Sequence, residues 1–324
     1  MTLKMNDVKE IFNIINNSDH ICISGHKAPD GDCIGSVMAL YGFLKPLNKK
    51  ITVLIDGSIP FNYKHFVKEG IISQEYDGSE FDVLFILDCS DAERLGRFND
   101  IVNHAKKSVC IDHHITNDNF ADINIIDSMA SSTGELLFDV MRTTDMEITK
   151  EIATNIYIAI VTDTGKFSYS KTSSHTHQIA AELIDIGVDV AEIDNILYNS
   201  KPSNVVKAYI ECISNIELYY DNKFGITTIT QEILNKNDIK MGDVDGVVEF
   251  IREIKEVEVS CVLKEAKDKS TKVSLRSKND IDVAAVSVKF GGGGHVKAAG
   301  FELNETIENA KKILVNNFKE YFGE

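Results

Sequence analysis

The chain has 324 residues, which is more than one compact domain usually needs and fits two domains. Hydrophobic residues make up 43% and charged residues 26% of it, so a wholly disordered, collagen-like or coiled-coil protein is excluded. Lysine and arginine total 34 against 50 aspartate and glutamate residues, and the resulting net charge of -16 repels long nucleic acid.

The first part of the chain alternates short apolar runs with helical patterns, which is typical of an α/β domain with a parallel sheet and helices on both faces. The predicted strands are 21–24, 51–55, 83–87 and 108–111. The predicted helices are 6–16, 34–45, 131–143, 150–161 and 175–186. Ser174 is the expected N-cap of the last helix.

After Gly187 this pattern stops, and a polar, partly helical connection is expected over 188–206. We therefore predict a first domain over 1–187 and a smaller α+β domain over 207–324. The predicted strands of this second domain are 214–220, 224–230, 256–264 and 271–277. Its predicted helices are 244–253, 282–288 and 306–321.

Cellular location is predicted from what the chain lacks. No apolar run reaches the length of a membrane-spanning helix, and the first residues lack the pattern of a signal peptide. The 6 cysteines are scattered without a CxxC pair, which argues against a disulfide framework and a zinc cluster. We expect a cytoplasmic protein with reduced thiols and no membrane partner.

Acidic and histidine side chains follow the predicted strands directly. The segments are GHKAPDGDCIGS after the first strand, LDCSD after the third, IDHH after the fourth and IVTDTGKF at the end of a helix. They contain His26, Asp30, Asp32, Asp88, Asp91, Asp112, His113, His114 and Asp163. In any one segment such residues are ordinary turn or capping residues. Because four segments place them at the strand and helix ends where α/β sheets bind ligands, a common site is favoured.

Imidazole and carboxylate ligands without a thiolate favour Mn²⁺, with Mg²⁺ and Co²⁺ as alternatives. Two such ions about 3.5 to 4 Å apart, sharing a carboxylate, activate water at neutral pH and polarise a phosphoryl oxygen. The predicted reaction is therefore hydrolysis of a phosphoester or a phosphoanhydride.

The same segments carry a family resemblance. HKAPDGD, LDCSD, IDHH and TDTG resemble the four successive motifs of the DHH phosphoesterase superfamily, and SLRS with GGGGHVKAAGF resembles the DHHA1 domain. Together, the segments that resemble these two domains extend over nearly the whole chain. Members of this size are bifunctional oligoribonucleases that also dephosphorylate phosphoadenosine phosphate, called nanoRNases. The resemblance implies a DHH domain, a DHHA1 domain and an active site in the cleft between them.

The resemblance also implies roles for individual residues. The implied ligands of two divalent ions are His26 and Asp30 for one, Asp32, His113 and Asp163 for the other, and Asp88 as the bridge. His114 would face the substrate phosphate as an electrostatic or proton-donating group, and Asp112 would orient the adjacent imidazole. Cys33 departs from the common pattern, in which a small apolar residue stands there, and this bears on oxidation tolerance rather than on ligation.

The second domain supplies the expected substrate contacts. A bare glycine run is usually a flexible hinge, but in GGGGH it precedes a histidine, so the loop can present backbone N–H groups to an anion. Arg276 would be a solvated strand residue by default, and the resemblance makes it a phosphate contact. The expected substrate-binding residues are Arg276, Gly292, Gly293, Gly294 and His295.

We predict a manganese-dependent hydrolase that degrades very short RNA to mononucleotides and removes the 3′-phosphate from 3′-phosphoadenosine 5′-phosphate. Its partners would be short RNA oligonucleotides and small phosphorylated nucleotides, and a homodimer rests on family analogy alone. The alternatives are a phosphodiesterase for linear dinucleotides from cyclic-dinucleotide breakdown and a non-catalytic nucleotide-binding regulator. An inorganic pyrophosphatase is disfavoured by GGGGH, and a single-strand DNA exonuclease by the net charge of -16.

Overall fold

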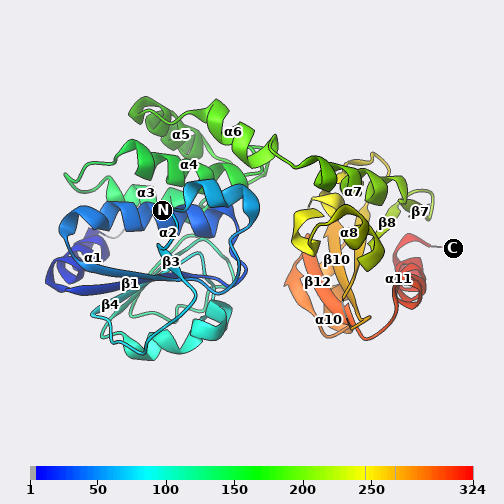
Figure 1. The fold of residues 1–324 in the computed structure, drawn as a ribbon, viewed down its shortest axis with the longest axis horizontal. Helices are drawn as coiled ribbons and strands as arrows, with labels where there is room; N and C mark the ends of the chain where they lie inside the picture. Colours follow the sequence, from blue (N-terminus) through cyan, green and yellow to red (C-terminus); the bar gives the residue numbers. More distant parts are fainter. Residues whose placement is uncertain (1–4, 245, 267, 324) are drawn as a thin grey trace. The chain divides into compact units, whose positions relative to one another are not determined.

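The computed structural model of the chain describes residues 5–244, 246–266 and 268–323. The chain forms two compact units that divide between Ser200 and Lys201 (Figure 1). The range 188–206, expected as a partly helical connection, contains helix α6 (Val190–Tyr198) and the start of α7 (Ser203–Ser214). Among the described residues, no helix is both long enough and apolar enough to span a bilayer.

The first unit is built on a parallel sheet, as predicted, and the sheet has six strands where four were predicted. The strands are β1 (His20–Gly25), β2 (Lys50–Leu54), β3 (Ile72–Ser73), β4 (Val83–Leu87), β5 (Ser108–Asp112) and β6 (Ile123–Ile126), in the order β3-β2-β1-β4-β5-β6. The order reverses at β1, which pairs with β2 on one side and β4 on the other. In open α/β sheets, this reversal places a ligand-binding crevice beyond the carboxyl ends of the two central strands.

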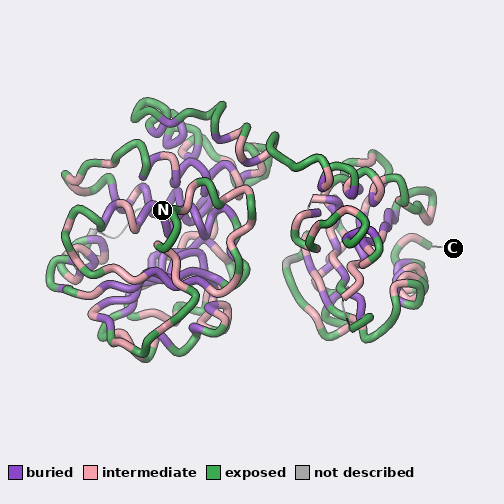
Figure 2. Tube along the Cα trace, viewed as in Figure 1, coloured by how far each residue is buried: buried purple, intermediate pink, exposed green. Residues whose placement is uncertain are grey.

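Helices cover one face of this sheet and a 3-10 segment covers the other. The α-helices are α1 (Met5–Asn17), α2 (Gly31–Leu44), α3 (Thr133–Met141), α4 (Lys150–Asp163) and α5 (Ser174–Ile186). Together with the sheet they form the larger apolar core, while η3 (Ala92–His104) packs its buried Leu95, Phe98 and Ile101 against the opposite face. Figure 2 shows the central strands of the sheet as buried segments, and β1, β4 and β5 are buried along nearly their whole length. Their burial on both faces explains why β1, β4 and β5 read as uninterrupted apolar runs.

The cap of α5 differs from the prediction. Ser173 is the N-cap, because its hydroxyl accepts from the Thr176 backbone N–H while the Thr176 side chain bonds back to Ser173. Ser174, which was predicted to be the cap, is the first helical residue. The two serines are adjacent in sequence, and only the reciprocal bond with Thr176 distinguishes the cap from the first helical residue.

Helices α2 and α4 approach closely at Gly35. A Cβ built on Gly35 would lie 2.5 Å from the Asn155 carbonyl oxygen and 2.8 Å from the Ala159 nitrogen, both of them backbone atoms. We expect Gly35→Ala to force the helices apart and to destabilise the first unit by about 1 to 3 kcal/mol. Thermal unfolding measures the loss as a lower Tm.

The matched control for this prediction is Gly42→Ala on the same helix. A Cβ at Gly42 meets only the flexible Ile152 side chain, at 3.1 Å, so a smaller change in Tm is expected. Equal Tm values for the two variants would contradict the backbone-contact argument.

The second unit has a mixed sheet with helices on both faces. Its elements are β7 (Glu217–Tyr219), β8 (Phe224–Ile229), α8 (Gln231–Asn237), α9 (Val247–Glu253), β9 (Val259–Glu265), β10 (Thr271–Ser277), α10 (Val283–Lys289), β11 (Gly293–His295), β12 (Ala298–Leu303) and α11 (Ile307–Phe322). The strand order is β11-β12-β10-β9-β8-β7, with β8 and β9 parallel and the other pairs antiparallel. Helices α10 and α11 pack on one face, and α7, α8 and α9 on the other.

The glycine run that was expected as a loop is partly a strand. Gly293, Gly294 and His295 form β11, which pairs antiparallel with β12 at the edge of the sheet. Gly294 has φ of 139°, and a Cβ there would lie 2.5 Å from the Ala298 carbonyl oxygen. Glycine is therefore required for this close pairing. The side chain of His295 lies outside what the structure describes.

Candidate metal centre

The loop after β1 leads directly into helix α2. Asp30 is the N-cap of this helix, and its Oδ1 accepts from the backbone N–H groups of Asp32 and Cys33, at 3.1 Å each. The same oxygen lies 3.7 Å from His26 Nε2. The capping role considered in the sequence is therefore present, and it holds Asp30 beside His26.

Asp88, which directly follows β4, lies among three imidazoles. Its carboxylate oxygens are 3.4 Å from His26 Nε2, 3.8 Å from His113 Nε2 and 3.6 Å from His114 Nδ1. The residue is 1% exposed and has φ of 56°, the left-handed region that a non-glycine residue rarely adopts. Such strained conformations cluster at functional sites, where the surrounding structure holds them.

A second set of groups surrounds His113. Its Nε2 lies 3.3 Å from Asp163 Oδ2 and 3.6 Å from Asp32 Oδ2. Its other ring nitrogen, Nδ1, lies 3.2 Å from the Ala130 carbonyl oxygen. This contact orients the ring with Nε2 toward the carboxylates, as the outer partners of metal-bound histidines do.

Among the residues that the structure describes, three groups of side chains have ligand atoms close enough together to hold a metal ion. They are His26 with Cys33 and Asp88, Asp88 with His113 and His114, and Asp32 with His113 and Asp163. All these ligand atoms lie within 4.8 Å of one another inside each group. The structure thus brings His26, Asp32, Asp88, His113 and Asp163 together, and Asp30 adjoins the cluster through His26. Cys33 lies beside it with a buried thiol whose pKa is raised well above its usual value by burial and neighbouring carboxylates.

The amino end of α3 holds two of the carboxylates. Asp32 accepts from the backbone N–H groups of Thr133 at 2.7 Å and Gly134 at 3.0 Å. The Ser36 hydroxyl also donates to Asp32, and the Thr133 hydroxyl donates to Asp88, each at 3.1 Å. The two backbone donors to Asp32 were not predicted, because N–H groups more than a hundred residues away carry no sequence signal.

Asp112 bonds to both neighbouring histidines. Its Oδ1 accepts from the His113 backbone N–H at 2.8 Å and lies 2.7 Å from His114 Nδ1, while its Oδ2 accepts from Asn117 at 2.7 Å. Asn117 was not predicted, although it follows IDHH by only three residues. A second unpredicted residue is Lys171, whose Nζ lies 3.5 Å from the His113 carbonyl oxygen.

The buried carboxylates of the cluster lie close enough together to raise the pKa values of Asp32 and Asp163. Burial, together with the charges of Asp88 and Asp163, raises the pKa of Asp32 well above its usual value. Burial and the charges of nearby carboxylates raise the pKa of Asp163 to about 6. Burial lowers the pKa of His26, but bonds to Asp30 and Asp88 outweigh it and raise the value to about 10. In the metal-free protein these shifts favour the protonated forms of Asp32, Asp163 and His26, and a bound divalent cation would favour the deprotonated ones.

This proton binding gives a pH-dependent prediction for the metal-free protein. Asp163 ionises near pH 3.8 when unfolded and at about pH 6 when folded, so between these values the folded state binds more protons. The free energy of unfolding should therefore fall as pH rises through this window, relative to an Asp163→Asn variant that cannot titrate. Thermal scans of both proteins across the window measure the difference. A constant offset in Tm would contradict the prediction.

The substrate-binding residues expected in the second unit are placed as follows. Arg276 lies on β10, where its Nε donates to Glu249 Oε1 at 3.0 Å and its Nη1 to the Leu275 carbonyl oxygen at 3.0 Å. Gly292 immediately precedes β11 and packs so closely that a Cβ would lie 2.3 Å from the Gly300 carbonyl oxygen. Gly293 and Gly294 belong to β11 itself.

Known protein families and individual proteins match most of the chain. The model of the DHH family N-terminal domain matches residues 20–160, and that of the DHHA1 domain matches residues 222–324. The bifunctional oligoribonuclease and PAP phosphatase NrnA of Thermus thermophilus is 30% identical over 307 residues, which is 93% of this chain and 88% of that protein. The Bacillus subtilis protein of the same name is 26% identical, over 95% of this chain and 96% of its own length.

A solved structure agrees with these matches. An exopolyphosphatase-related protein from Bacteroides fragilis superimposes with a TM-score of 0.93 at 29% identity, and the alignment covers 100% of both chains. The family matches include the segments that carry His26, Asp88 and His113 in the first unit and Arg276 in the second. The chain therefore belongs to the DHH family, with a DHH N-terminal domain followed by a DHHA1 domain.

Proposed function

We propose that this protein is a metal-dependent phosphoesterase that hydrolyses very short oligoribonucleotides to mononucleotides and converts 3′-phosphoadenosine 5′-phosphate to AMP. The observation that carries the proposal is the cluster of carboxylates and imidazoles at the reversal of strand order, in a chain that matches oligoribonucleases over 93% of its length. The net charge of -16 further favours short substrates, because a long polyanion would run along repulsive surface.

The donor atoms of the cluster fit hard or borderline divalent cations, and we propose two ions, with Mn²⁺ as the physiological choice. His26, Asp30 and Asp88 would hold one ion, and Asp32, Asp88, His113 and Asp163 the other. When bound, such ions polarise a phosphoryl oxygen and lower the pKa of a water.

The protein prepares this centre through its own contacts. Asp32 is already oriented by two backbone N–H groups and a hydroxyl, so its carboxylate needs little rearrangement to take a ligand position. Asp112 accepts from His114 Nδ1, and this bond helps to raise the pKa of His114 against the effect of burial. In its protonated form His114 can donate from Nε2 to a phosphate oxygen, which is the role we propose for it.

We propose that the second unit binds a substrate phosphate through Arg276, Gly292, Gly293, Gly294 and His295. Glu249 holds Arg276 at Nε and a backbone carbonyl holds it at Nη1. These bonds orient the planar guanidinium and leave Nη2 to a phosphate. Glu249 therefore supports phosphate binding by positioning Arg276.

A hydrolysis assay tests the proposal. The native protein with Mn²⁺ is given 5′-labelled RNAs from the dinucleotide upward, with phosphoadenosine phosphate and pyrophosphate in parallel. Preferential turnover of the shortest RNAs is expected. Turnover of pyrophosphate alone, or nucleotide binding without any turnover, would contradict it and favour a pyrophosphatase or a regulator. Turnover confined to 5′-phosphorylated dinucleotides would favour the linear-dinucleotide phosphodiesterase.

Arg276→Ala tests the role of the second unit in the same assay. Loss of a charge-assisted contact worth about 1.5 to 3 kcal/mol corresponds to an increase in KM of roughly 10- to 100-fold. Lys272→Ala is the matched control, because Lys272 is an exposed cation on the same strand. Equal KM values for the two variants would rule out Arg276 as a phosphate contact.

A further inference from the structure

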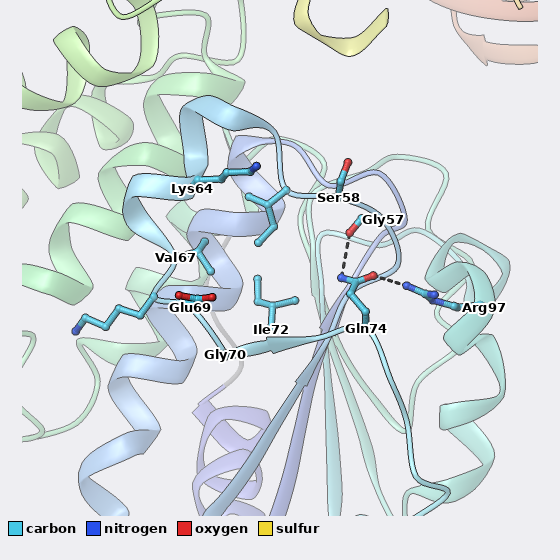
Figure 3. A pocket seen from close by; sticks show the side chains of 11 residues that line it. Gly57, Ser58, Lys64, Val67, Glu69, Gly70, Ile72, Gln74 and Arg97 are labelled. Atoms are coloured by element: carbon cyan, nitrogen blue, oxygen red, sulfur yellow. Dashed lines mark hydrogen bonds between the residues drawn. The ribbon is translucent and has the colours of Figure 1, made fainter. Parts of the chain in front are cut away.

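The first unit contains a pocket of about 690 Å³ that the proposed chemistry does not use. It lies beyond the carboxyl end of β2 and alongside β3, and Figure 3 shows side chains converging on it from several segments. Gly57 and Ser58 come from the loop after β2, Lys64 from η2 (Phe61–Phe66), and Ile72 and Gln74 from β3 and the residues after it. The volume lies within the range of roughly 300 to 1,000 Å³ that is typical of small-molecule sites.

The pocket has an apolar wall. Ile59, Val67 and Ile72 line it, and each is half-buried, so each leaves part of its side chain accessible from the pocket. An apolar wall of branched side chains suits the face of a flat ring. The first requirement on a ligand is therefore an apolar part, which the face of a planar ring can supply.

Two of the cationic side chains that line the pocket are occupied. Lys68 forms an ion pair with Glu151 at 2.8 Å. Arg97 pairs with Asp56 at 3.1 Å through Nε. Its Nη2 donates to the Gln74 side chain, and Figure 3 draws this second bond. Because Lys68 and Arg97 are bonded to other protein groups, they stabilise the wall of the pocket and are not the cations that a ligand would bind.

Three polar groups of the lining are available. Within the ranges that the structure describes, the side chains of Ser58, Lys64 and Glu69 have neither a hydrogen bond nor an ion pair. Lys64 can bind an anionic group, Glu69 can accept from an amino group, and Ser58 can do either as a hydroxyl. The second requirement on a ligand is therefore an anionic group together with N–H donors.

A nucleoside monophosphate with an amino-bearing base meets both requirements. We propose that this pocket binds such a nucleotide, with the base on the apolar wall, its amino group on Glu69 and its phosphate on Lys64. The proposal rests on the proposed function, because nucleoside monophosphates are the product class of that reaction. It adds a binding site separate from the carboxylate and imidazole cluster.

The pocket wall is in direct contact with the loop that carries His26 and Asp30. The Asp56 carbonyl oxygen accepts from the Ala28 backbone N–H at 2.9 Å. Gly57 has φ of 117°, and a Cβ there would lie 3.2 Å from the Ala28 nitrogen. A nucleotide held in the pocket would thus lie next to the loop on which the reaction depends.

AMP binding to metal-free protein tests the proposal. Chelation removes phosphate binding by divalent ions, and an Arg276→Ala background weakens the phosphate site proposed for the second unit. The change in AMP affinity between this background and the pocket variants made in it, measured by calorimetry or ligand-observed NMR, then reports on this pocket. Lys64→Glu reverses the charge at the proposed phosphate contact, and Ser58→Trp places a large side chain in the lining of the pocket. We expect each to weaken AMP binding at least tenfold. Lys45→Glu, at an exposed lysine outside the pocket lining, is the matched control and should bind AMP as the parent does.

Inorganic phosphate and adenosine complete the experiment. Both should bind more weakly than AMP, because each satisfies only one of the two requirements. AMP binding that is unchanged in both pocket variants, or phosphate binding as tight as that of AMP, would overturn the proposal. The RNA assay is independent, so a protein that binds AMP here but fails to cleave RNA would contradict the proposed function alone.

Discussion

Asp88→Asn is expected to lower kcat for an RNA dinucleotide by about 10³-fold, since metal-ion stabilisation of a phosphoryl transition state is worth several kcal/mol. Asp88 lies within 3.8 Å of His26, His113 and His114, so its charge is shared by both parts of the cluster. Asparagine preserves the shape of the side chain and tolerates the left-handed backbone at φ of 56°. The measurement is steady-state hydrolysis together with circular dichroism to confirm folding.

Asp91→Asn is the matched control in the same loop. Asp91 caps η3 by accepting from the Arg94 backbone N–H at 2.9 Å, and asparagine caps a helix about as well as aspartate. Activity close to that of the native protein is expected. An Asp88→Asn variant that keeps more than a tenth of the native kcat would show that the carboxylate charge is dispensable.

Removal of divalent ions is the second large effect. A chelator should abolish hydrolysis, and Mn²⁺ should restore it. At a hundredfold excess over Kd, ion binding stabilises the folded state by about 2.7 kcal/mol, which corresponds to a rise in Tm of roughly 5 to 10 °C for a unit of this size. Turnover that persists in chelator would contradict a metal-dependent mechanism.

Asp32→Asn tests whether the rise in Tm comes from an ion bound at the cluster or from ions bound elsewhere on the protein. Asp32 is buried, 1% exposed, and lies beside His113 and Asp163, so its charge should be needed for the rise in Tm. The Mn²⁺-dependent rise in Tm should be smaller in this variant than in the native protein. An equal rise would place the ion elsewhere on the acidic surface.

In the sheet of the first unit, the strands whose residues are almost all buried could be predicted from the sequence. Strands β1, β4 and β5 are buried along nearly their whole length, and such strands read as continuous apolar runs. Strand β3 has only two residues and β6 alternates buried with half-buried residues, so neither stands out. Strand β11 was missed because its two glycines supply no side-chain pattern at all.

In the candidate site, too, some features could be predicted from the sequence and others could not. His26, Asp88 and His113 could be placed together because each follows a strand of one parallel sheet, and parallel strands end at one edge. The partners of these side chains could not be predicted. Glu249 reaches Arg276 from a helix 27 residues earlier, and Lys171 reaches His113 from a loop 58 residues later. Such pairs depend on how helices and loops pack, which a local pattern does not encode.

The placement of Asp32 has a consequence for assembly of the centre. It stands in the first turn of α2, and its carboxylate faces the amino end of α3, so the positive ends of two helix dipoles point toward the most crowded acidic region. These fixed dipoles offset part of the repulsion between the carboxylates before any cation arrives. We therefore expect the polypeptide to fold before it binds metal, so that metal loading would be a later, reversible event that follows the supply of ions in the cell.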